Sequence, residues 1–422
     1  MAAVAEAVNN LEDSKKPGTG GLHSVVRRPI LDLKNRVHAF KLVFRGESET
    51  SGQDNRSMLE TAAILKLDKP SEFQKLTGEL MAFVSCPWHA LNERLAQTLP
   101  PTLTVLEIEP PPELSPEAIA ACQRLKALGF RFALDDSFSE PVAEPLCQLA
   151  DYVKVDIGRS GLEERKDLFE RLRGKQITML AKNVETQKEY LQAREEGFTL
   201  FEGYYFCQAV AKRDRRPPAN QVLRIQILQA LQHNPLKLRE LSELVRRDGP
   251  LAFQLLRLVN SPLYAMRQVV KSIEGALLAV GDDAFRRIAT MAIAREFNGD
   301  QPAELLCMAV MRARFCEVAG TQLGLDVFGQ YLLGLLSLLP AMLGQSMSEV
   351  VPSLPLSPEI RDALLETANR ERALLGWLEH FECGDWAGCD AAAEADGLDQ
   401  DELAKVYRYA IAWTESALFS AD

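Results

Sequence analysis

The 422-residue sequence has few of the side chains that hold metal ions or covalent cross-links. It contains five histidines and eight cysteines, and the cysteines form no CxxC pair and no regular framework. Scattered thiols of this kind argue against structural zinc and against a disulfide-stabilised secreted fold. They are typical of a reducing compartment, so we expect a cytoplasmic protein.

The sequence also lacks long apolar runs. None reaches the ~20 residues that a transmembrane helix needs. The segment 332–343 is apolar, but Gly334, Ser337 and Pro340 interrupt it, which indicates a buried helix and loop. Residues 1–23 lack the basic and then apolar pattern of a signal peptide, and we expect a flexible lead-in there. No membrane partner is predicted.

Positive charge is in short supply. The chain has 48 Lys and Arg against 59 Asp and Glu, a formal net charge of -11. Because phosphate backbones are bound by clustered cations, this balance argues against a broad nucleic-acid-binding surface. The hydrophobic content of 47% is that of an ordinary globular protein, and the length predicts two or three domains.

In the first half of the chain, apolar strand-like segments alternate with amphipathic helix-like segments. This alternation predicts parallel strands with right-handed crossovers, and the number of strands is near that of a β/α barrel. The predicted strands are 37–44, 80–84, 103–109, 132–134, one around Val153, 176–180 and 198–205. The predicted helices are 58–65, 90–97, 116–128, 141–150, 161–172 and 186–196.

Polar residues follow the ends of these strands in a series. In a barrel they would meet at one mouth, where charged groups are costly unless they meet a ligand, a metal or each other. A single member has simpler explanations: Asp135 could cap the next helix, with Asp136 solvated. The series consists of Lys41, Arg45, Glu107, Asp135, Asp136, Lys154, Asp156, Lys182, Glu185 and Glu202.

The order and spacing of these segments resemble the EAL domain, a barrel that hydrolyses cyclic di-GMP with divalent metals. The similarity spans residues 24–212. It is carried by LEIE at 106–109, LDD at 134–136, KVD at 154–156, AKNVET at 181–186 and EGYYF at 202–206. The resemblance implies a candidate ligand-binding set of Arg45, Glu107, Asp135, Asp136, Lys154, Asp156 and Glu185.

Four residues depart from the family pattern at the implied site, and two of them reverse charge inside its metal site. Lys41 replaces a glutamate ligand, Ser85 an asparagine, Lys182 the first glutamate of AEGVET, and Glu202 a glutamine. An ammonium cannot coordinate a divalent cation and repels it. Lys41 and Lys182 are instead able to pair with Glu107 and Asp135. Two-metal hydrolysis needs both cations, so we expect a barrel without catalysis, metal or cofactor.

A charged, proline-containing segment, 213–221, is predicted to link this barrel to a second domain, 222–422. Helical periodicity dominates there. The segment DGPLAFQLLRLVNSPLY, at 248–264, resembles the HDOD domain, a helical bundle related to HD phosphohydrolases. Only His233 and His380 lie in this half, and neither precedes an aspartate, so no HD metal site is expected. Asn260, Ser261 and Tyr264 either line a binding surface or end and pack their helix.

The predicted architecture is α/β plus all-α, an EAL-type β/α (TIM-like) barrel followed by an HDOD bundle. The resemblance implies a bacterial signalling protein of cyclic di-GMP circuitry, in motility or biofilm formation, that acts through protein partners. Two alternatives stay open, namely a cyclic di-GMP receptor and a residual phosphodiesterase. The sequence leaves the oligomeric state undetermined.

Overall fold

The structure, a computed structural model, describes residues 24–45, 65–86, 91, 98–108, 115–135, 144–209, 220–264, 266 and 268–419. The chain divides into two compact units. We call residues 18–205 with 380–387 the barrel unit, and residues 206–379 with 388–422 the helical unit.

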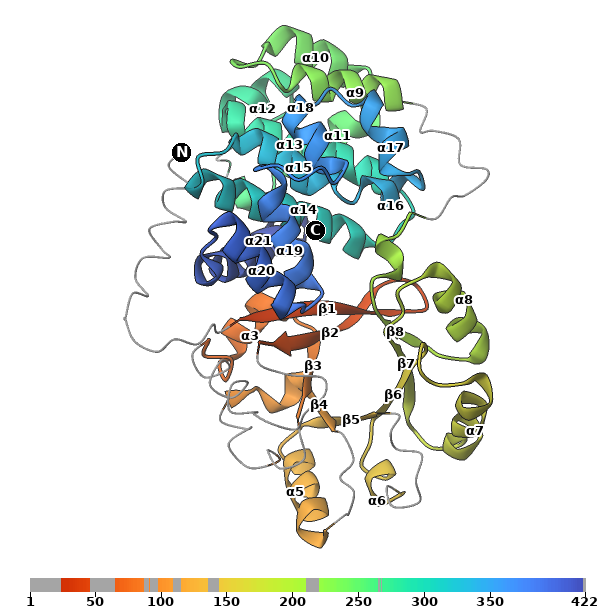
Figure 1. Cartoon of the computed structure of the whole chain (residues 1–422). Coiled ribbons are helices and arrows are strands. Elements are labelled where there is room, and N and C mark those ends of the chain that lie inside the picture. The colour runs from red at the N-terminus through yellow and green to blue at the C-terminus, as the bar shows by residue number, and fades with distance from the viewer. Residues whose placement is uncertain are drawn as a thin grey trace. The chain divides into compact units, whose positions relative to one another are not determined.

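Eight strands of the described residues close into a barrel in chain order (Figure 1). Strands β2 to β8 pair in parallel, as predicted, whereas β1 runs antiparallel to both β2 and β8. The sequence analysis did not predict β1. The strands are β1 Val25–Asp32, β2 Val37–Phe44, β3 Met81–Ser85, β4 Thr104–Ile108, β5 Arg131–Asp135, β6 Tyr152–Asp156, β7 Thr178–Lys182 and β8 Leu200–Glu202.

The helices between the strands follow their capping signals. Ser115 accepts the backbone N–H of Ala118, and Thr186 forms a capping box with Glu189, so two predicted helices begin where expected. Of the helix predicted at 141–150, the described part is a single turn; those at 58–65 and 90–97 lie outside the described residues except Leu65 and Leu91. The described elements are α3 Pro70–Thr77, η2 Pro101–Leu103, α5 Pro116–Ala127, α6 Glu144–Cys147, α7 Leu162–Leu172 and α8 Gln187–Glu196.

The last predicted strand is shorter than expected. It ends at Glu202, and η5 Tyr205–Cys207 occupies the rest of the predicted segment. Gly203 has a φ of 145°, and a Cβ there would lie 2.1 Å from the carbonyl oxygen of Val184. Only glycine fits this approach, which turns the chain directly after Glu202 and fixes the position of that residue.

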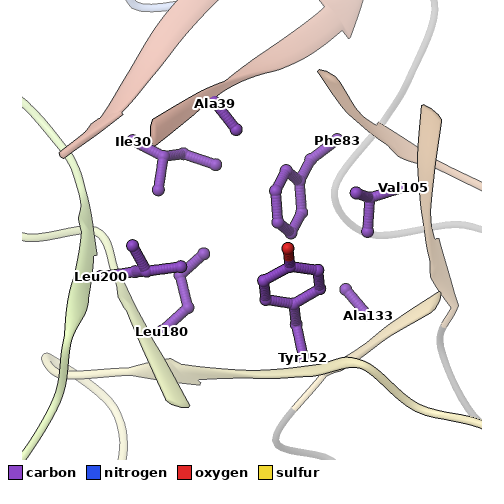
Figure 2. Close-up of a cluster of buried hydrophobic side chains, with 8 residues drawn as sticks. All are labelled: Ile30, Ala39, Phe83, Val105, Ala133, Tyr152, Leu180 and Leu200. Atoms are coloured by element: carbon purple, nitrogen blue, oxygen red, sulfur yellow. The ribbon is translucent and has the colours of Figure 1, made fainter. Parts of the chain in front are cut away.

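The floor of the barrel is apolar. Each strand contributes one inward-facing side chain to a buried cluster (Figure 2). Two aromatic members, Phe83 and Tyr152, meet edge to face with ring centres 5.0 Å apart. The alternation of side chains along each strand selects these positions. They are Ile30, Ala39, Phe83, Val105, Ala133, Tyr152, Leu180 and Leu200, from β1 to β8 in turn.

The helical unit confirms the all-α prediction for the second half. Asp248 caps the helix that begins at Gly249, Ser272 caps the helix that begins at Ile273, and Gly281 ends that helix. The helices are α9 Gln221–Ala230, α10 Leu238–Arg246, α11 Gly249–Val259, η6 Pro262–Tyr264, α12 Ile273–Val280, α13 Asp282–Asn298, α14 Ala303–Gln322, α15 Val327–Leu336, α16 Leu339–Leu343, α17 Met347–Val350, η7 Val351–Ser353, α18 Pro358–Leu364, α19 Arg372–Glu382, α20 Trp386–Asp396 and α21 Gln400–Phe419.

Helix α14 forms the core of this unit. Its residues 304–320 are all buried, and it packs against both α15 and α21 (Figure 1). Gly334 lets α15 approach closely, because a Cβ at this position would lie 2.4 Å from the backbone oxygen of Arg312 on α14. Within the described part of the chain, no helix has the length and apolar character needed to cross a bilayer.

Candidate functional site at the barrel mouth

A layer of polar side chains lies directly above the apolar floor. On each of β2 to β8, the floor residue is followed two positions later by a polar residue, and strand pleating points both toward the barrel axis. We call these residues the mouth cluster. In strand order, they are Lys41, Ser85, Glu107, Asp135, Lys154, Lys182 and Glu202. Six of these seven residues belong to the series that the sequence predicted to converge; Ser85 had been singled out only as a departure from the family pattern.

The even-numbered strands supply a continuous chain of ion pairs. Lys41 Nζ donates to Glu107 Oε2 and also to Ser85 Oγ. Lys154 Nζ donates to the other oxygen of Glu107, and it lies 2.6 Å from Glu202 Oε2. The side chains of Lys41, Glu107, Lys154 and Glu202 are 8, 14, 5 and 7% exposed, so these charges are shielded from water. Barrels place side chains from alternate strands in one layer, which explains why these four residues meet.

The odd-numbered strands supply a second pair. Lys182 Nζ lies 2.5 Å from Asp135 Oδ2, and this pair is more open, with 18 and 28% of the side chains exposed. The Lys41–Glu107 and Lys182–Asp135 pairs that the sequence suggested are thus both present. Lys182 comes from β7, two strands after the strand that carries Asp135, and its ammonium donates to the Asp135 carboxylate.

Asp156 lies at the end of β6 and is buried. Its Oδ2 accepts a hydrogen bond of 2.8 Å from Asn183 Nδ2. Its Oδ1 accepts the backbone N–H groups of Gly158 and Arg159, at 2.9 and 3.1 Å. The carboxylate of Asp156 therefore organises the loop after β6 and receives an amide donor from the loop after β7.

The ion pairs determine the protonation of the buried groups. Burial by itself would raise the pKa of Glu107, but the charges of Lys154 and Lys41 and their hydrogen bonds outweigh it and lower the pKa to about 2. Burial would lower the pKa of Lys154, yet the charges of Glu107 and Glu202 outweigh it and raise that pKa. Glu107 therefore stays a carboxylate and Lys154 stays an ammonium over the ordinary pH range.

The remaining predicted site residues lie at the edge of this cluster or outside it. Glu185 is exposed, and partial burial of its carboxyl raises its pKa, an effect that the N–H of Tyr204 opposes. Arg45 follows β2, and its N–H donates to the Ser24 carbonyl at 2.9 Å. Asp136 lies outside the described residues.

Two residues of the site were missed from the sequence. The sequence analysis quoted Asn183 only within the AKNVET motif and gave it no role, although its side-chain amide donates to Asp156. Arg28 belongs to the unpredicted strand β1, where it pairs in register with Lys41. Because β1 runs antiparallel to its neighbours, its residue on the mouth side comes two positions before the floor residue Ile30. That residue is Arg28. Its charge acts on Glu185.

The donors of this mouth do not fit a pair of divalent cations. An ammonium group contacts Glu107 from each side and another contacts Asp135, so both carboxylates already have a cation where a metal would bind. The ammonium groups of Lys41, Lys154 and Lys182 lie against Glu107, Glu202 and Asp135, so each of these described carboxylates is paired with a cation. Among the described residues, no group of three or more His, Cys, Asp or Glu side chains is arranged to hold an ion.

Comparison with known proteins identifies one domain in the second half of the chain. Residues 217–372 match the HDOD domain family. The chain contains an HDOD domain. This domain follows the eight-stranded barrel, in agreement with the predicted order of a barrel and then a helical bundle.

Two relatives match along nearly their whole length. The cyclic di-GMP phosphodiesterase CdgJ of Vibrio cholerae is 29% identical over 93% of this chain and 92% of its own. YuxH of Bacillus subtilis, an uncharacterized protein, is 26% identical over 93% of this chain and 98% of its own. Among solved structures, a cyclic di-GMP-bound standalone EAL protein from Vibrio cholerae aligns with a TM-score of 0.35 and 20% identity, covering 43% of this chain and 90% of that one.

Proposed function

We propose that this protein is a non-catalytic regulator in cyclic di-GMP-related signalling, and that it acts through protein partners. The observation that carries the proposal is the pairing of Lys41 with Glu107 and of Lys182 with Asp135. Two-metal hydrolysis needs a pair of cations to generate hydroxide and to stabilise the leaving oxygen. Internal ammonium groups in their place neutralise the carboxylates but supply neither role.

The similarity to signalling proteins supports the assignment to cyclic di-GMP-related signalling. A relative that matches 93% of this chain is named a cyclic di-GMP phosphodiesterase, and in this chain an HDOD domain follows the barrel. A second candidate function is a cyclic di-GMP receptor. Lys182 and Asp135 form the more open pair, so the mouth offers a cation at its surface that could meet a ligand phosphate without metal.

The deciding experiment is a calorimetric titration of the full chain with cyclic di-GMP, with and without Mg²⁺, followed by assay of the same samples for the linear dinucleotide. We expect no turnover in either condition. Micromolar binding without product would support the cyclic di-GMP receptor and contradict a regulator that binds no nucleotide. Metal-dependent product would contradict the proposal.

A charge reversal tests the physical reason for it. In the double variant Lys41→Glu/Lys182→Glu, both ammonium groups become carboxylates beside Glu107 and Asp135, so we expect a saturable Mg²⁺ or Mn²⁺ site that the natural chain lacks. The matched control is Lys166→Glu, which reverses an exposed lysine on α7 and should bind no metal. If the natural chain bound the metal as tightly as the folded double variant does, the lysines would not be excluding cations.

A further inference from the structure

A second ionic cluster lies inside the helical unit, and the proposed function does not use it. Arg314 on α14 donates through Nη1 to Glu317 Oε2 at 2.6 Å and through Nη2 to the hydroxyl of Tyr409 on α21 at 2.5 Å. Arg287 on α13 donates to the other oxygen of Glu317 at 2.8 Å. One carboxylate therefore serves two guanidinium groups. We call Arg287, Arg314 and Glu317, with the nearby Tyr264, the arginine cluster.

The described members of the cluster carry one more positive than negative charge. The charged groups that act on the Tyr264 phenol are Arg287, Arg314 and Glu317, two cations and one anion. The side chains of Arg314 and Glu317 are only 4 and 2% exposed. The rings of Tyr409 and Trp413 lie 5.1 Å from the Arg314 guanidinium carbon, which disperses its charge but does not neutralise it. Buried charge without a counter-charge is costly, so the cluster is complementary to an added anion.

The cluster also has hydrogen-bond donors to spare. Arg314 Nε is buried without a hydrogen-bond partner, and so is the Oγ of Ser261 on the segment that carries Tyr264. Burial raises the pKa of Tyr264 to about 12, so its hydroxyl remains a donor at neutral pH. Arg287, with 19% of its side chain exposed, and the half-buried Tyr264 are the members of the cluster nearest to solvent.

We propose that the arginine cluster binds an anion, and that its ligand presents a phosphate group. Two guanidinium groups and a phenol hydroxyl match the several oxygens of a phosphate, and arginine forks recognise such oxygens in pairs. This site is independent of the barrel mouth, so failure of either proposal leaves the other standing. Its residues come from α13, from α14 and from the segment 260–264. For Asn260, Ser261 and Tyr264 of that segment, the sequence analysis left open a binding surface or a role in ending and packing the helix.

The first test is a calorimetric titration of the full chain with inorganic phosphate at constant ionic strength, against a chloride control. We expect one saturable site, and we expect Arg287→Gln to weaken it at least tenfold. The control Arg295→Gln changes another arginine of α13 and should leave the affinity unaltered. The proposal is overturned if phosphate does not saturate, or if a folded Arg287→Gln variant binds as well as the natural chain.

Two further variants separate an anion site from a purely structural cluster. Tyr264→Phe removes one hydroxyl and should weaken phosphate binding about threefold or more. Glu317→Gln removes the competing carboxylate and should strengthen it by a similar factor, although the fold loses an ion pair. A structural cluster predicts neither change, and unchanged affinity in both variants would refute the proposal. Guanosine 5′-monophosphate that binds more tightly than phosphate would identify a nucleotide source, and equal affinity a free phosphate; either supports the site.

Discussion

Replacement of Lys154 by methionine should destabilise the barrel unit more than any exposed lysine could. Lys154 is 5% exposed and stands between Glu107 and Glu202. Glu107 keeps Lys41 as a partner, whereas Glu202 loses the cation against which it is buried. Removal of one member of a buried ion pair costs about 3–5 kcal/mol, because the other charge is left in a poorly solvated site. At about 2–4 °C per kcal/mol for a unit of this size, the melting temperature should fall by roughly 6–20 °C.

The measurement is differential scanning calorimetry of the full chain, which separates the transition of the barrel unit from that of the helical unit. The control Lys166→Met removes an exposed lysine, 59% accessible and paired only along its own helix, and should cost less than about 0.5 kcal/mol. In the double variant Lys154→Met/Glu202→Gln, the stranded carboxylate is gone, so part of the lost stability should return. A loss below about 1 kcal/mol in Lys154→Met would refute the view that these charges depend on each other.

Two other predictions concern pH and packing. The lowered pKa of Glu107 contributes stability that is fully present above its ordinary value of 4.5 and is lost as the pH falls toward about 2; acid titration of the barrel transition should show this loss, and a flat profile from pH 5 to 2 would contradict it. Gly334→Ala should destabilise the helical unit by about 1–3 kcal/mol, because the added methyl would overlap a carbonyl of α14. At Gly376, on α19, no atom lies within 4 Å of the added methyl, so Gly376→Ala should instead stabilise the unit by roughly 0.5–1 kcal/mol. A change in the free energy of unfolding with the same sign in both variants would contradict this packing.

The strands of the barrel were predictable where apolar residues dominate them. Strand β2 has the predicted bounds, and the later strands differ by a few residues at their ends. Strand β1 was missed because its sequence contains two arginines and Pro29, which weaken the strand signal. The structure accommodates Pro29 because the pairing of β1 with β8 covers only Ile30 to Asp32, beyond the proline. Arg27 is held by the carbonyl oxygen of Leu76 at 2.8 Å and lies over the Phe40 ring.

The chemical identity of the mouth was also readable from the sequence. Strand ends that carry Lys41, Glu107, Asp135, Lys154 and Lys182 had to bring lysines and carboxylates together once the barrel closed, and the two suggested ion pairs are present. The sequence did not indicate that Lys154 bridges two carboxylates. That contact depends on the stagger of neighbouring strands, which is a property of the closed barrel and not of any one segment.

The sequence by itself indicated most of the strands and helices, and it placed lysines together with carboxylates at the predicted barrel mouth. These features are local: they depend on side-chain period, on cap residues and on charge. The tertiary structure alone decided the antiparallel entry of β1, the even-strand order of the ion-pair chain, and the meeting of Arg287 and Arg314 on one carboxylate. Each of these joins residues far apart in the chain, and only the packing of several elements sets the distance between them.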